Sequence, residues 1–287
     1  MCHVADLYLS IVLIALWFGL AFVYAARAIL IGRVAHARTE ADGGSIFVNK
    51  AAMEMVYWVL NPLVSFLAAL RLTPNMVTLG SLIPAAGAGV AIGFGNFGLG
   101  ALLSVIATFG DILDGLLARK MGLSSDAGEV VDAAVDRYGE MFFFGGLVYY
   151  YRGHDQVLFI VLLALAGSFM VSYATAKAEA MGVPAPRGAM RRGERGTYLI
   201  AGSAFTPIAS TLFAGSPSLA LRELPIILSL TIIAVVANIS VVQRLAATAA
   251  MLRAREAAKH PTGKPPAASP FDDETMATKP DVPVGMV

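Results

Sequence analysis

Cysteine is almost missing from this sequence, and charged residues are scarce. The 287 residues include a single cysteine, Cys2, which excludes an internal disulfide framework and any metal site built from several cysteines. Only 14% of the residues are charged, against about 25% in average soluble proteins. Because 57% are hydrophobic and the mean hydropathy is +0.70, the composition is that of a membrane protein.

An overall basic excess is also absent, since the formal net charge is +1. The chain therefore has no electrostatic signature of nucleic-acid binding, and we expect no nucleic-acid partner. The segment from Met1 to Asp6 contains no lysine or arginine, and the apolar run after it is too long for the apolar region of a signal peptide. We interpret this run as a retained membrane-spanning helix.

Seven stretches approach or exceed the length of about 20 apolar residues that crosses the hydrocarbon core of a bilayer. They are residues 7–31, 74–95, 97–119, 129–151, 156–178, 195–214 and 223–246. A helix near 51–70, which contains Tyr57 and Trp58, is expected to lie along the membrane interface, where such aromatic side chains concentrate. The predicted fold is an all-α, polytopic integral membrane protein.

Lysine and arginine are distributed unevenly between the two sides of these spans. The loops on one side contain only Arg152 and Arg222, and the remaining basic residues near span ends lie on the other side. Because positively charged loops stay in the cytoplasm, we expect the N-terminus outside and the C-terminus inside the cell (inner, cytoplasmic) membrane. Residues 1–50 would form an added spanning helix and a cytoplasmic loop, 51–255 the membrane domain, and 256–287, with six of the 14 prolines, a disordered cytoplasmic tail.

Four aspartates gather at the predicted cytoplasmic ends of two consecutive spans. Asp111 and Asp114 are spaced i, i+3, and Asp132 and Asp136 are spaced i, i+4, so each pair shares one helix face. Facing lipid, each carboxylate would cost about 2.5–3.5 kcal/mol. No histidine or cysteine lies among them, and crowded carboxylates favour hard divalent cations. We therefore expect Mg²⁺ or Mn²⁺ as cofactor, with two ions for the four carboxylates.

Small and basic residues accompany these aspartates. Gly115 and Ala118 lie on one side of the helix, where their size would let a nucleotide approach the backbone, and Arg119 is suited to a phosphate oxygen. With two metal ions, the cluster would hold the diphosphate of an activated donor. One carboxylate would be left to accept a proton from an attacking hydroxyl.

Residues 111–136 resemble the signature of the CDP-alcohol phosphotransferase family, Asp-x2-Asp-Gly-x2-Ala-Arg-x8-Gly-x3-Asp-x3-Asp, with every fixed position filled. The resemblance extends over about residues 55–250 and implies a six-helix core, a pair of metal ions at the cytoplasmic face and, as a rule, a homodimer. It also implies Asp136 as the catalytic base. The implied activity is transfer of a phosphatidyl group from CDP-diacylglycerol to a polar alcohol, with release of CMP, in phospholipid biosynthesis.

A second element, Thr73-Pro74-Asn75-Met76-Val77-Thr78, resembles the family's Thr-Pro-Asn-x-x-Thr sequence near the nucleotide pocket. The same residues also fit a helix start, with Thr73 as N-cap and proline in the first turn. The donor site implied by the resemblance consists of Asn75, Thr78, Asp114, Gly115, Ala118, Arg119 and Gly128.

The segment from Ser172 to Arg195 is similar to the branch of the family that makes phosphatidylinositol phosphate from inositol 1-phosphate. It departs from that branch at Lys177, Arg191 and Gly193. The resemblance makes a phosphorylated acceptor, with inositol 1-phosphate as the leading candidate, the expected substrate. The acceptor-binding residues that it implies are Lys177, Arg187, Arg192 and Arg195.

Three alternatives stay open. The same chemistry fits glycerol 3-phosphate or another alcohol as acceptor. A cation transporter would also contain carboxylates within the membrane, although here all four gather near one face and other spans have none at comparable depth. The third alternative is a relative that binds substrate without turnover, which the complete carboxylate set disfavours.

Overall fold

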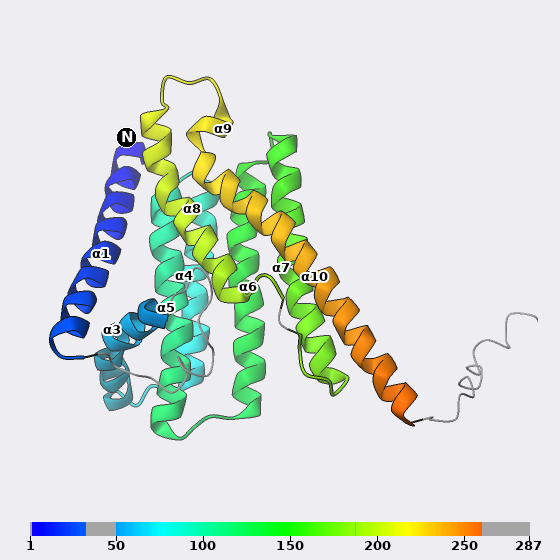
Figure 1. Cartoon of the computed structure of the whole chain (residues 1–287). Coiled ribbons are helices and arrows are strands. Elements are labelled where there is room, and N and C mark those ends of the chain that lie inside the picture. Colours follow the sequence, from blue (N-terminus) through cyan, green and yellow to red (C-terminus); the bar gives the residue numbers. More distant parts are fainter. Residues whose placement is uncertain (1, 33–49, 187, 260–287) are drawn as a thin grey trace, which may run out of the picture.

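The described part of the chain is helical throughout. The computed structural model describes residues 2–32, 50–186 and 188–259, and these ranges contain helices, turns and loops but no strand. The all-α prediction is confirmed. In chain order the helices are α1 (Cys2–Leu30), α3 (Lys50–Ala69), α4 (Pro74–Gly93), α5 (Phe97–Met121), α6 (Asp126–Tyr150), α7 (Asp155–Ala180), α8 (Arg192–Leu212), α9 (Leu219–Arg222) and α10 (Leu224–Lys259) (Figure 1).

Helices occupy all seven stretches expected to span the membrane, but not all of them have the composition of a span. Among the described residues, six helices are long and apolar enough to cross a membrane: α1, α3, α4, α5, α7 and α10. Two expected spans, α6 and α8, fall short because α6 carries the acidic residues of the cluster and α8 is rich in glycine, serine and threonine. Both nevertheless run within the bundle beside the other helices (Figure 1).

Helix α3 covers the segment that we expected along the interface. It lies across the lower end of α5 in Figure 1, and its residues Leu60 and Val64 pack against Leu113 and Leu117 of α5. By length and composition, Ala51–Ala69 also suits a span, so the interfacial position stays a prediction.

A close approach between α4 and α6 depends on two glycines. A Cβ atom at Gly89 would collide with the carbonyl oxygen of Phe142, and one at Gly146 would collide with the carbonyl oxygen of Gly89. Without side chains at these positions the two backbones can touch. This contact holds α6, with Asp132 and Asp136, against α4, which contains Thr78.

The main apolar core lies among α6, α7, α8 and α10. Fully buried side chains from three of these helices meet there, including Phe144, Leu147, Val161, Ile226 and Leu230. Burial of side chains of this size stabilises a fold by about 1.5–3 kcal/mol each in water, and in a bilayer the same contacts act through packing. The core fixes α8 and α10 against α6 and α7.

The first helix is joined to the rest by buried polar contacts at both ends. The Asp6 carboxylate accepts hydrogen bonds from the backbone N–H groups of Gly98 (3.0 Å) and Leu99 (2.8 Å) at the start of α5. Near the other end of α1, the Tyr24 hydroxyl donates to Glu54 of α3 at 2.9 Å. Asp6 thus supplies the side-chain cap that Asn96 does not make for α5.

Helix α10 is the longest element, with 36 residues, and it crosses the bundle obliquely (Figure 1). At 1.5 Å per residue it is about 54 Å long, well beyond the roughly 30 Å of a hydrocarbon core. It continues to Lys259, so residues 256–259, which we had assigned to a disordered tail, are helical. The tail beyond them lies outside the described residues.

Candidate active site

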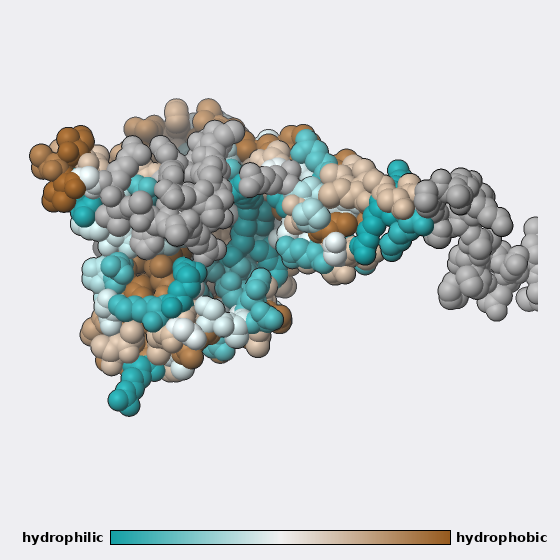
Figure 2. Space-filling model, turned by 60° about the horizontal axis from the view of Figure 1, so that its bottom comes forward, coloured by the Kyte–Doolittle hydropathy of each residue, from teal (hydrophilic) through white to brown (hydrophobic). Residues whose placement is uncertain are grey.

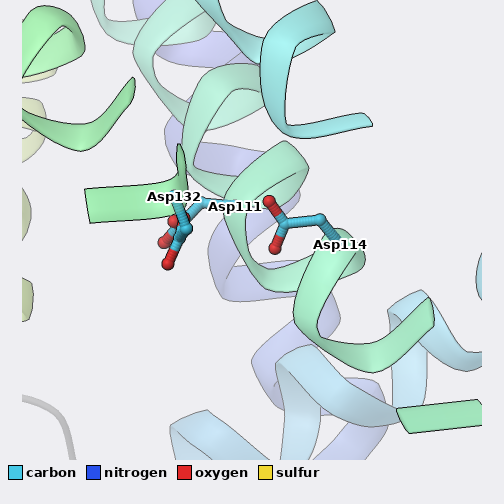
Figure 3. Close-up of side chains that lie close together, drawn as sticks. All are labelled: Asp111, Asp114 and Asp132. Atoms are coloured by element: carbon cyan, nitrogen blue, oxygen red, sulfur yellow. The ribbon is translucent and has the colours of Figure 1, made fainter. Parts of the chain in front are cut away.

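Three of the four aspartates form a compact cluster. Asp111, Asp114 and Asp132 each offer a carboxylate oxygen, and these oxygens lie within 4.8 Å of one another. Figure 3 shows the Asp111 and Asp132 side chains next to each other, with the Asp114 carboxylate directed toward them from the same end of α5. The structure therefore brings together three of the four aspartates that helical spacing predicts to converge. A set of oxygen ligands this close together fits a hard divalent cation.

The cluster is reinforced from α4. The Thr78 hydroxyl hydrogen-bonds to the Asp114 carboxylate, and both groups are buried. At the start of the same helix, Thr73 accepts from the backbone N–H of Met76 at 3.4 Å and Pro74 occupies the first turn, as expected for a helix start. Thr78, which we expected beside the donor, thus also orients an aspartate.

The other expected donor residues lie around this cluster. A Cβ atom at Gly128 would lie 3.7 Å from Asn75 Oδ1, so these two positions face each other across the starts of α6 and α4. A Cβ atom at Gly115 would lie 3.4 Å from the Arg119 guanidinium, which folds back over it. Ala118 is half-buried in the same turn of α5. The structure brings the expected donor residues to one end of the bundle.

Asp136 has a different partner from the other three aspartates. The Arg192 guanidinium forms an ion pair with Asp136 and lies 3.6 Å from an Asp111 oxygen. Arg192, which we expected to bind the acceptor, stands at the start of α8 with 44% of its side chain exposed. It therefore sits between the aspartate cluster and the loop that precedes α8.

Two cavities meet at Asp136 and Arg192. The first, of about 380 Å³, lies among α4, α5, α6 and α8 and has mainly small and apolar walls. The second, of about 340 Å³, lies among α6, α7, α8 and α10. Both are lined by Asp136 and Arg192, and only the first includes Asp111. Figure 2, which views the molecule from its lower end, shows hydrophilic side chains gathered in a band across the middle of that face.

The second cavity is lined by arginines from α6, α8 and α10 and by the arginine that directly precedes α8. We call it the arginine cavity; its basic residues are Arg137, Arg191, Arg192, Arg195 and Arg244. Two carboxylates, Asp136 and Glu179, also line it. The excess of guanidinium groups suits an anion with several oxygens, such as a phosphate.

Arg195 is the most deeply buried of these arginines, with 1% of its side chain exposed. Its Nε donates to Glu140 at 3.1 Å, and neither of its terminal nitrogens has a hydrogen-bond partner among the described residues. Arg137 donates to the other Glu140 oxygen and to Ser172, each at 2.6 Å. The i, i+3 ion pair between Arg137 and Glu140 is therefore part of a larger network that includes Arg195 and Ser172.

The residues of this cavity differ from the acceptor site expected from the sequence. Arg244 is not among the expected acceptor residues, yet it lines the cavity, is buried and donates to Thr175 at 2.6 Å. The available signal was that Arg244 lies within the apolar part of α10, four residues after Ser240 and well before the charged residues at the end of the helix. Lys177 is exposed and does not line the arginine cavity, and Arg187 lies outside the described residues.

A family model named CDP-alcohol phosphatidyltransferase matches residues 71–219, which include the aspartate cluster and the start of α8. The chain belongs to this family. It is thus a membrane enzyme that transfers a phosphatidyl group from a CDP-activated donor to an alcohol, and the family depends on a divalent metal.

Several relatives in this family have more specific names. The chain is 31% identical over 207 residues to phosphatidylinositol phosphate synthase of Streptomyces avermitilis, an alignment that covers 70% of this chain and 82% of the relative. It is 35% identical over 161 residues to the enzyme of the same name from Mycobacterium marinum, covering 55% and 68% of the two chains.

The fold is similar to crystal structures of Mycobacterium tuberculosis phosphatidylinositol phosphate synthase. The structure with manganese and citrate gives a TM-score of 0.58 at 27% identity, covering 65% of this chain and 87% of that one. The structure with CDP-DAG bound gives 0.56 at the same identity, covering 65% and 92%. Both likenesses leave part of this chain, about a third, without a counterpart.

Proposed function

We propose that this enzyme transfers the phosphatidyl group of CDP-diacylglycerol to a hydroxyl of a phosphorylated polyol, with inositol 1-phosphate as the leading candidate. The observation that carries the proposal is the junction of the two cavities. An acceptor phosphate held in the arginine cavity would have its hydroxyl near Asp136, and Asp136 also lines the cavity that contains Asp111.

The aspartate cluster is the proposed metal site. Asp111, Asp114 and Asp132 have the geometry to hold a divalent cation, and Asp136 would contribute to a second ion. When bound, the metal would neutralise the negative charge of the donor diphosphate and of the departing CMP. Asn75, Thr78, Gly115, Ala118, Arg119 and Gly128 would surround the nucleotide.

The proposed reaction is a single displacement at phosphorus. The acceptor oxygen bonds to the phosphorus that bears diacylglycerol, the bond from that phosphorus to the CMP oxygen breaks, and the hydroxyl proton passes to Asp136. Arg192 pairs with Asp136 and so holds that carboxylate at the junction of the two cavities, where the acceptor hydroxyl would lie. A positioned general base of this kind contributes about 10²–10⁴-fold to the rate.

Two further observations support a phosphorylated acceptor. The terminal nitrogens of Arg195 are buried and have no hydrogen-bond partner among the described residues, and such groups gain most from an anion that accepts their hydrogen bonds. The Streptomyces and Mycobacterium relatives are named for phosphatidylinositol phosphate. Glycerol 3-phosphate, which also carries a phosphate, is the second candidate because the arginine cavity does not by itself specify the sugar ring.

Turnover with matched pairs of acceptors tests the proposal. The purified protein is incubated with CDP-diacylglycerol, Mg²⁺ and inositol 1-phosphate, inositol, glycerol 3-phosphate or glycerol, and CMP release and the lipid product are measured. We expect each phosphorylated acceptor to exceed its neutral counterpart, with inositol 1-phosphate fastest. A neutral alcohol as the better substrate would refute the phosphate assignment, and absence of CMP release with all acceptors would favour the transporter or the inactive relative.

We further propose that the site faces the cytoplasm and that the enzyme is a homodimer in the cell membrane. The orientation rests on the lysine and arginine asymmetry, and the dimer rests on the family resemblance. In Figure 1 the N-terminus is at the upper end, and the lower end of α10 is opposite it. Mass measurement of the detergent-solubilised protein by light scattering tests the dimer, since a monomer mass would contradict it.

A further inference from the structure

Glu140 occupies the wall between the two cavities. Its carboxylate lines the first cavity and not the arginine cavity, and 11% of its side chain is exposed. One oxygen accepts from Arg137 Nη1 at 2.6 Å, and the other accepts from Arg195 Nε at 3.1 Å. A single carboxylate therefore holds two of the arginines from outside the cavity that they line.

The atoms used in these contacts decide which way the guanidinium groups point. Glu140 engages Arg195 through Nε, at the base of the guanidinium, so both terminal nitrogens remain available on the far side. Because the guanidinium is planar and rigid, fixing one edge fixes the direction of the others. Ser172, from α7, accepts a second hydrogen bond from Arg137 and limits its rotation.

The carboxylates inside the arginine cavity have other positions. Asp136 is paired with Arg192, and Glu179 lines the wall near the end of α7. Without a negative group behind them, Arg137 and Arg195 would bring two like charges into a buried region, which is unfavourable. Glu140 pairs with both arginines and offsets one of the two charges, so a net positive charge remains for an anion, and Glu140 itself does not line the arginine cavity.

We infer that Glu140 is a positioning residue that sets Arg137 and Arg195 for the acceptor phosphate. It touches neither substrate and acts through the two arginines. The inference rests on the proposed function, because it assigns the arginine cavity to a phosphate. It predicts that loss of the Glu140 charge damages acceptor binding selectively.

The test is Glu140→Gln, with steady-state kinetics in which acceptor and donor are varied separately. The amide keeps one acceptor oxygen but turns an N–H group toward a guanidinium, so one arginine loses its anchor. We expect the KM for inositol 1-phosphate to rise about ten-fold or more, since hydrogen bonds to charged groups are involved. The kcat and the donor KM should each stay within about two-fold of wild type. Glu140→Asp, which keeps the charge, should recover part of the loss.

Glu223→Gln provides a matched control. Glu223 is also a buried carboxylate that accepts two hydrogen bonds, from Tyr150 (2.6 Å) and Tyr151 (2.7 Å), but at the other end of α6. The Glu223→Gln variant should have a changed thermal stability but an unchanged acceptor KM. A similar rise in acceptor KM in both variants would reduce Glu140 to a general contributor to the fold, as would equal damage to donor and acceptor constants.

A binding measurement separates this inference from the proposed function. Inorganic phosphate should compete with the acceptor in wild type and compete more weakly in Glu140→Gln. If phosphate does not compete in wild type, and neutral alcohols react better, the proposed function itself fails. If phosphate competes equally in wild type, Glu140→Gln and Glu140→Asp, the acceptor assignment stands and the role of Glu140 is wrong.

Discussion

Replacing Arg244 with alanine should weaken acceptor use strongly and leave donor binding nearly unchanged. Arg244 is 7% exposed and reaches the arginine cavity from α10. Its guanidinium is held by Thr175 at 2.6 Å and more loosely by Ser240 (3.4 Å) and the carbonyl oxygen of Met190 (3.5 Å). Such a group is already oriented for a phosphate, so binding requires little further ordering of its side chain.

The size of the effect follows from the bonds lost. A hydrogen bond to a charged group contributes about 1.5–3 kcal/mol, and 1.4 kcal/mol is a factor of ten, so the acceptor KM should rise about ten-fold to a hundred-fold. The fold should survive, because the Thr175 hydroxyl keeps its own bond to the carbonyl oxygen of Val171 at 3.0 Å. Loss of the buried guanidinium should cost no more than about 1–3 kcal/mol of stability.

The assay is CMP release by purified protein at varied inositol 1-phosphate and fixed, saturating CDP-diacylglycerol, followed by the reverse. Arg253→Ala is the control, since Arg253 is an exposed arginine on the same helix. An unchanged acceptor constant in Arg244→Ala, or an equal rise in the donor constant, would refute the assignment of Arg244 to the acceptor cavity.

Four further predictions follow from the site and the fold. Asp132→Asn should abolish both Mn²⁺ binding, measured by calorimetry, and turnover; near-normal turnover of this variant in a chelator would contradict the metal site. Asp136→Asn should lower kcat by about 10²–10⁴-fold while the donor constant changes little, and equal damage to both would assign Asp136 to metal binding alone. A cysteine at Ala185 should resist a membrane-impermeant thiol reagent in intact cells, whereas one at Gly153 should react, and the opposite labelling would reverse the orientation; a cysteine at Gly43, also expected to be protected, lies outside the described residues. Asp6→Ala should lower the melting temperature through a loss of about 1–3 kcal/mol, because two backbone N–H groups lose their acceptor. An unchanged melting temperature would mean that water or lipid headgroups replace the carboxylate.

The helices could be predicted from hydropathy because a bilayer imposes their length and requires internal hydrogen bonding. Composition was less informative for α6 and α8. Charged residues in the first part of α6 and at the start of α8 line the cavities, and α8 is also rich in glycine, serine and threonine, so the average hydropathy of both helices is low although they are part of the bundle. The polar residues that contribute to the proposed site thus also lower the hydropathy by which a membrane span is recognised.

Helical spacing was sufficient to predict the aspartate cluster because its members come from two helices joined by a short turn. The arginine cavity required the tertiary structure. Its residues come from α6, α7, α8 and α10 and from Arg191 before α8, and no local pattern relates Arg244 to Arg195. Spacing also could not show that Asp136 pairs with Arg192 rather than joining the other aspartates.

The distribution of charge gives a physical reason for two cavities rather than one. In the proposed reaction both substrates are anionic, so a single cation-lined site would bring two groups of like charge into competition. Here Asp111, from the aspartate cluster that suits a metal-bound diphosphate, lines the first cavity, and the arginines that suit an acceptor phosphate gather in the second; the two cavities meet at Asp136 and Arg192. The proposed proton acceptor, Asp136, therefore lies at the boundary where the acceptor hydroxyl would meet the donor phosphorus, and the two phosphate groups would be held apart by separate positive charges. This separation predicts that substitutions in the arginine cavity change acceptor constants, that substitutions in the aspartate cluster change metal and donor constants, and that Asp136→Asn, at the boundary, lowers kcat with little change in the donor constant.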